Sequence, residues 1–122
     1  MPRTLAVFYK NRKGNVPVLE WLDLLPVKIQ DKCVVKIERL SELGHELRRP
    51  EADLLRNGIY ELRVGWEGMN CLILYCFQGR IAAVLAHGII KEREVPAKEI
   101  ERALKRKRLF EQDPDGHTYR EG

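Results

Sequence analysis

Hydrophobic and polar positions change their period along the chain, and this change separates helices from strands. Residues 5–10 are apolar and rich in β-formers, which predicts a first strand. A helical hairpin is expected next, with Pro17 in the first turn of a short helix that Pro26 ends. A longer helix then runs to about Leu43, because apolar residues recur at helical spacing, and Gly44 supplies its stop.

The second half of the chain has the period of two that is typical of strands. Residues 48–58 are polar and include Pro50, so we expect an irregular connection there. Three strand-like runs follow, separated by segments short enough for antiparallel hairpins: residues 59–64, 71–77 and 81–87. Pro96 opens a last helix. Together these elements predict an α+β fold with an N-terminal strand, a helical hairpin, a three-stranded antiparallel meander and a C-terminal helix.

In this arrangement the helical hairpin covers one face of the sheet. The other face is expected to be partly open, with the C-terminal helix at its edge.

The chain has 122 residues, 44% of them hydrophobic and 33% charged, which fits one globular domain rather than a disordered protein. We expect a single domain over residues 1–112 and a flexible polar tail over residues 113–122. No apolar run is long enough for a membrane span and no signal peptide is recognised, so the expected location is cytoplasmic.

The three cysteines do not predict a metal site or a disulfide. Cys71 and Cys76 fall in one strand at an odd separation, which places them on opposite faces of the sheet. Cys33 belongs to a helix, and no spacing resembles that of zinc ligands. We therefore expect buried, reduced thiols and neither a metal nor another cofactor.

Positive charge is concentrated near the C-terminus. The net charge is only +4, but six cations lie between residues 98 and 108 against Glu99 and Glu101. These cations are Lys98, Arg102, Lys105, Arg106, Lys107 and Arg108. A solvated helix face is the ordinary interpretation, and a surface that binds a polyanion is the alternative.

Two further groups of residues are candidates for chemistry. Alternation in residues 59–64 places Glu61 and Arg63 together on the open face of the sheet, where a simple charge pair is the ordinary interpretation. His87 ends the last strand, and Lys91 and Arg93 follow in the connection to the last helix. Cations at a strand end can bind a scissile phosphate, and a histidine can transfer protons near neutral pH. Plain surface cations and a structural histidine remain the alternative.

Aromatic residues give a weaker indication of RNA binding. Trp66 falls in an expected hairpin turn, where stacking on an unpaired base and contact with a protein partner are equally good interpretations. Tyr75 is better explained as a core residue. His117 and Tyr119 fall in the expected flexible tail.

An ordered set of short segments carries a resemblance to a known family. The segments are Val16-Pro17-Val18-Leu19-Glu20-Trp21-Leu22, Leu24-Leu25-Pro26, Gly58-Ile59-Tyr60-Glu61-Leu62-Arg63, Ile73-Leu74-Tyr75, Ala86-His87-Gly88-Ile89-Ile90-Lys91, Val95-Pro96 and Glu99-Ile100-Glu101-Arg102-Ala103. This set, which extends over about residues 5–112, resembles the RelE/ParE toxin superfamily, and within it the phage-derived, HigB-like toxins of type II toxin–antitoxin systems.

The resemblance implies a metal-independent endoribonuclease that cleaves mRNA on the ribosome and is neutralised by a cognate helix-turn-helix antitoxin, in a complex whose order is left open. By the match, Arg63 and Lys91 fall on basic positions of the family pattern, and His87 falls on its histidine-glycine step. We therefore expect Arg63, Lys91 and Arg93 to bind and stabilise the phosphate, with His87 as the candidate for proton transfer. We also expect five cations of the last helix to contact the backbone of the RNA or of ribosomal RNA: Lys98, Arg102, Lys105, Arg106 and Arg108.

The sequence departs from the family pattern at two positions. Leu72 stands where the branch often has an arginine, and Glu92 stands where it favours a second lysine, although Arg93 can substitute. Fewer cations stabilise a phosphate less well. Two other functions therefore stay open: a weak or inactive relative that acts as a protein-binding module, and a toxin directed at DNA gyrase.

Overall fold

The computed structural model describes residues 4–90 and 95–120. Its elements are β1 (Leu5–Phe8), α1 (Pro17–Asp23), α2 (Val27–Leu43), η1 (Gly44–Glu46), β2 (Ala52–Arg56), β3 (Ile59–Trp66), β4 (Met69–Gln78), β5 (Ile81–Ile90) and α3 (Ala97–Gln112). The five strands form one sheet in the order β1-β5-β4-β3-β2. Neighbouring strands are antiparallel except β1, which runs parallel to β5. The α+β fold class is confirmed, with a mixed sheet.

The helical hairpin forms for the local reasons that the sequence provides. Pro17 occupies the first turn of α1, where its missing N–H is not needed. Pro26 is the N-cap of α2, and this helix ends at Gly44, whose φ of 54° suits a residue without a Cβ. Among the described residues, none of the helices could span a membrane.

The expected irregular connection at residues 48–58 is partly wrong, because it contains strand β2. The turn between β2 and β3 is Asn57-Gly58, with φ values of 51° and 80°. Positive φ at both positions is the geometry of a tight hairpin turn, which Asn-Gly adopts readily. The meander therefore has four strands rather than three, and Asn-Gly was the sequence signal for the additional one.

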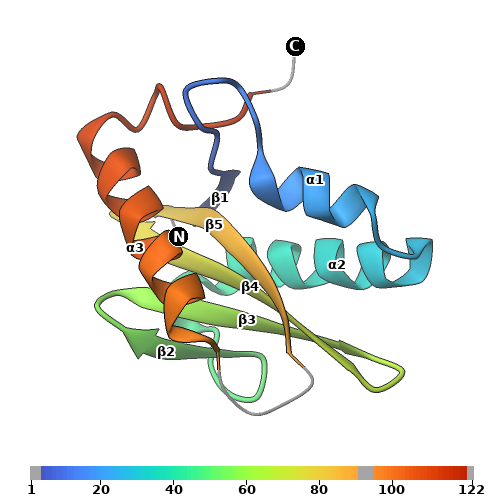
Figure 1. Cartoon of the computed structure of the whole chain (residues 1–122). Coiled ribbons are helices and arrows are strands. Elements are labelled where there is room, and N and C mark those ends of the chain that lie inside the picture. Colours follow the sequence, from blue (N-terminus) through green and yellow to red (C-terminus); the bar gives the residue numbers. More distant parts are fainter. Residues whose placement is uncertain (1–3, 91–94, 121–122) are drawn as a thin grey trace.

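Helices cover both faces of the sheet (Figure 1). On one face, α1 and α2 pack on a core that includes Trp21, Ile29 and Leu62. On the other face, α3 packs on a second core around Ile59, Leu85 and the fully buried Phe110. The C-terminal helix is not at the edge of this face as the sequence predicts, because Phe110 and Ala103 pack α3 onto the middle strands. The face is still only partly covered, since Arg63 on the same face is 40% exposed.

The two strand cysteines belong to different cores, as the odd separation predicts. Cys71 contacts the α1–α2 side and Cys76 contacts the α3 side. All three cysteines are free and buried. Burial raises the pKa of the Cys33 thiol to about 11 and that of the Cys76 thiol to about 12, so both thiols are protonated at neutral pH.

The segment after α3 lies against β1, in contrast to the flexible tail that the sequence predicts. Tyr9 and Thr118 form an antiparallel bridge. The His117 side chain is buried, its Nδ1 lies 2.8 Å from the carbonyl oxygen of Lys10, and its ring stacks on Tyr9. The sequence does not indicate this contact, because the segment is polar and its partners lie at the other end of the chain.

Candidate functional site

Arg63, the first candidate residue, lies on strand β3, in a row of paired residues that runs across β3, β4 and β5. Leu62 and Val64 point into the core below α1 and α2, so Arg63 lies on the opposite face, the one that α3 covers farther along. Arg63 is the register partner of Leu72, and Leu72 is the partner of Gly88. Leu72 is thus the apolar neighbour of the arginine on this face.

Three groups contact the guanidinium of Arg63. Its Nε donates to Glu61 Oε1 at 2.8 Å, its Nη1 donates to the Pro50 carbonyl oxygen at 3.4 Å, and its Nη2 lies 3.6 Å from Asp53 Oδ2. The Arg63 side chain is still 40% exposed. A guanidinium has five N–H donors, so the outer ones remain free to bind a phosphate in a fixed orientation.

Glu61 and Asp53 are therefore part of the site as residues that position Arg63. The Glu61 side chain is only 10% exposed, which corrects the expectation that it is presented on an open face. A hydrogen bond from Arg49 lowers the pKa of Asp53, so its carboxylate stays charged beside Arg63. The sequence signal for Glu61 was its place two residues before Arg63, whereas nothing local pointed to Asp53.

A hollow of about 630 Å³ opens beside Arg63, between α2 and the edge of β3 that extends beyond β2. Lys32, Lys36 and Arg63 line it together with the acids Asp31 and Glu51. Hydrogen bonds from Arg39 and Lys36 lower the pKa of Glu51 to about 2. The charges in this hollow are thus largely balanced, and Arg63 stands at its rim as a cation held by carboxylates.

The other three candidate catalytic residues are less fully described. His87 belongs to β5 and is the register partner of Ile73, but its side chain lies outside the described part of the structure. Lys91 and Arg93 lie outside the described residues altogether. The structure therefore shows the contacts of Arg63 alone among these four.

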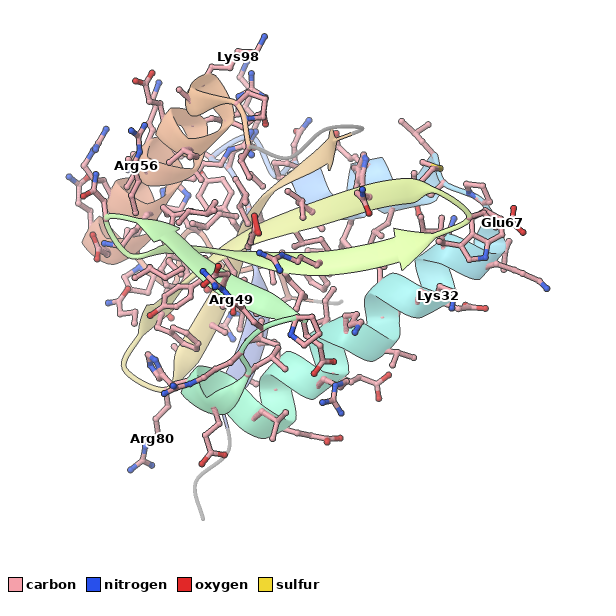
Figure 2. All side chains as sticks on the ribbon, turned by 90° about the horizontal axis from the view of Figure 1, so that it is seen from below. Lys32, Arg49, Arg56, Glu67, Arg80 and Lys98 are labelled. Carbon is pink, nitrogen blue, oxygen red and sulfur yellow. The ribbon has the colours of Figure 1, made fainter. Side chains whose placement is uncertain are left out.

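Four of the five candidate RNA-binding residues form a stripe on α3. They recur at helical spacing and are exposed: Lys98, Arg102, Lys105 and Arg108. Within residues 4–90 and 95–120, Lys98, Lys105 and Arg108 have no ion-pair partner, and Arg102 pairs with Glu99 at 3.1 Å. Figure 2 shows Lys98 extending outward from α3, away from the sheet. We call these four residues the α3 stripe.

The fifth candidate, Arg106, is used inside the fold. Its Nη1 donates to the Leu85 carbonyl oxygen at 2.9 Å, and its guanidinium lies over the ring of Tyr9. Burial lowers the pKa of Arg106. This side chain attaches α3 to β5 and β1 and is not part of the α3 stripe, although its place in the sequence of the helix gives no sign of the difference.

The described residues contain no cluster of histidine, cysteine and carboxylate side chains that could hold a metal ion. The fixed guanidinium of Arg63 and the exposed cations of the α3 stripe suit an anionic ligand.

Comparison with known proteins identifies the family to which the chain belongs. No curated protein matches the chain. The family model described as "Phage derived protein Gp49-like (DUF891)" matches residues 20–108. This range includes strands β2 to β5, Arg63 and the α3 stripe. The chain therefore belongs to the phage-derived Gp49-like family, which is one of the RelE-like toxin families of type II toxin–antitoxin systems.

Proposed function

We propose that this protein is a HigB-like toxin that cleaves mRNA on the ribosome. The observation that carries the proposal is the α3 stripe, on the same side of the sheet as Arg63, whose exposed cations have few acid partners among the described residues. Exposed surface cations in a row fit a phosphate backbone.

The proposed reaction uses the RNA's own nucleophile. The ribose 2′-oxygen attacks the adjacent phosphorus, the bond from phosphorus to the 5′-oxygen breaks, and a 2′,3′-cyclic phosphate and a 5′-hydroxyl result. A base takes the proton of the 2′-hydroxyl, and an acid gives a proton to the leaving 5′-oxygen. Arg63 stabilises the charge on the phosphate, Lys91 and Arg93 add to this charge stabilisation, and His87 transfers a proton.

Contacts around Arg63 support its part in this proposal. Glu61, Asp53 and the Pro50 carbonyl fix the guanidinium before a ligand arrives, so its remaining donors need little reorganisation on binding. Its register partner Leu72 is 8% exposed and adds no charge. A single arginine in this row makes the proposed nuclease weaker than one with two cations there.

The proposed function gives this protein two binding partners. Messenger RNA in the ribosome is the substrate, and a cognate helix-turn-helix antitoxin in the cytoplasm holds the toxin inactive. The α3 stripe would bind the RNA or ribosomal RNA backbone through Lys98, Arg102, Lys105 and Arg108, and each neutralised phosphate would make binding more sensitive to salt.

The test is to induce the protein without an antitoxin in a bacterial host and to map mRNA 5′ ends during growth arrest. We expect new 5′ ends only on translated messages and in phase with codons. Arg63→Ala should abolish them, while Arg120→Ala, which removes a surface arginine that pairs with Asp115, should leave them unchanged. Arrest with DNA damage and no new ends would instead identify a gyrase poison, and the absence of arrest would identify a binding module.

A further inference from the structure

A second hollow, of about 490 Å³, lies at the β2 end of the sheet on the face away from α3. His45 of η1 and Arg48 and Arg49 of the following segment line one side. Leu54 and Tyr60, which are register partners on β2 and β3, line another. Its volume is within the usual range for small-ligand sites. We call it the η1 hollow.

Aromatic rings form a fixed platform in the η1 hollow. The imidazole of His45 stacks on Phe77 with 3.6 Å between ring centroids, and His45 is exposed. Because Phe77 covers one face of this imidazole, the other face is available to a ligand. Tyr60 packs edge-on to the same Phe77 and stacks on Tyr75, which is fully buried. The platform is therefore anchored in the core through Phe77 and Tyr75.

Charge in the η1 hollow is positive. Within the described part of the chain, Arg48 has no ion-pair partner, while Arg49 pairs with Asp53 at 2.8 Å. Leu54 adds an apolar wall, since it is 52% exposed. Figure 2 shows Arg49 beside the β2 ribbon. The hollow thus combines an aromatic face, an apolar wall and an unpaired arginine.

Asp53 connects the η1 hollow to the proposed cleavage site. Its Oδ2 accepts from Arg49 Nε and lies 3.6 Å from Arg63 Nη2. The two arginines therefore flank one carboxylate, with Arg49 on the side of the η1 hollow and Arg63 on the side of the cleavage site.

We propose that the η1 hollow binds one unpaired nucleotide of the RNA strand. The base stacks on His45 beside Tyr60 and Leu54, and Arg48 binds the phosphate. This proposal deepens the proposed function and rests on it only for the identity of the strand. Aromatic faces tolerate every base, so the hollow fixes the position of a flanking nucleotide and does not select a sequence.

The test compares two fluorescein-labelled probes by anisotropy with the purified chain. One is a 2′-O-methyl oligoribonucleotide of about six nucleotides, which resists cleavage, and the other has the same length and charge but lacks bases. The native chain should bind the first probe at least about fivefold more tightly. His45→Ala should remove this preference and His45→Tyr should retain it, because only the first change removes the ring.

Charge variants provide the matched control. Arg48→Ala should weaken binding of both probes and reduce the salt slope of log Kd by about 0.7. Lys28→Ala removes one exposed charge at the other end of α2 and should leave base preference and affinity close to those of the native chain. Equal binding of both probes by the native chain, or no binding of either, would overturn the η1 proposal. A native base preference with no cleavage in cells would leave this proposal standing and remove only the proposed nuclease.

Discussion

Glu51 joins helix α2 to the segment before β2, and its replacement is the most direct test of the electrostatics described above. Its Oε1 lies 3.0 Å from Lys36 Nζ, and its Oε2 accepts from Arg39 Nη2 at 2.7 Å, so one carboxylate connects α2 to the segment before β2. Its backbone carbonyl also accepts from the Arg63 N–H at 2.8 Å. Glu51→Gln removes the charge and keeps the size of the side chain.

The magnitude follows from the pKa of Glu51, which the two cations lower from 4.5 to about 2. A shift of this size corresponds to about 3 kcal/mol. Arg39 is 43% exposed, so solvent screening reduces the expected loss to about 1–2 kcal/mol at neutral pH. Because the folded state has the lower pKa, this stabilisation is complete above pH 4.5 and is lost as the pH falls toward about 2.

Urea unfolding followed by circular dichroism between about pH 7 and pH 2.5 measures the effect. We expect Glu51→Gln to be less stable than the native chain at pH 7 and the difference to shrink below about pH 4.5. Glu38→Gln is the matched control, because Glu38 is exposed on α2 and has no ion-pair partner within the described residues. Equal stability of the two variants at pH 7, or a difference independent of pH, would refute the reasoning.

Three further predictions test the packing of the chain. Arg106→Met should lower the free energy of unfolding by about 1–3 kcal/mol, since it removes the hydrogen bond to Leu85 and the contact with Tyr9. Arg108→Met should change stability little and weaken RNA binding. Thermal unfolding measures the first effect and fluorescence anisotropy with labelled RNA measures the second. His117→Ala should lower unfolding free energy by about 2–3 kcal/mol in urea, and an unchanged midpoint would show that the segment after α3 is not packed. A thiol reagent at about pH 8 should label the native chain slowly and the unfolded chain fast, because burial keeps the thiols protonated; fast labelling of native protein would contradict this.

The sequence predicts elements well where periodicity is local and strong. The helical repeat of α2 and the alternation of β3 each follow from the spacing of apolar residues, so their bounds were close to those observed. Strand β2 was not predicted because it is five residues long, lies at the sheet edge and contains Asp53 and Arg56. Its hydrogen bonds come from β3, and only the Asn57-Gly58 turn signals this pairing locally.

The candidate site was predictable in part for a similar reason. Strand alternation places Arg63 on the correct face, but the groups that hold it include Pro50 and Asp53, which the sequence assigns to a connection. The exposed cations of α3 follow from helical spacing, yet the inward turn of Arg106 depends on Tyr9 and on a carbonyl of β5. Long-range partners decide these contacts, and no pattern along the chain reports them.

Strand β1 has a consequence for the order in which the protein assembles during synthesis. Its partner in the sheet is β5, with Leu5 opposite Ile81, and its end is closed by residues around His117, which lie 107 positions from Lys10. Strand β1 is therefore paired only after β5 has been translated. Contacts between such distant residues form slowly. The sheet of the nascent chain thus cannot be completed before β5 has been made, and the end of β1 is covered only after the segment around His117 has followed α3.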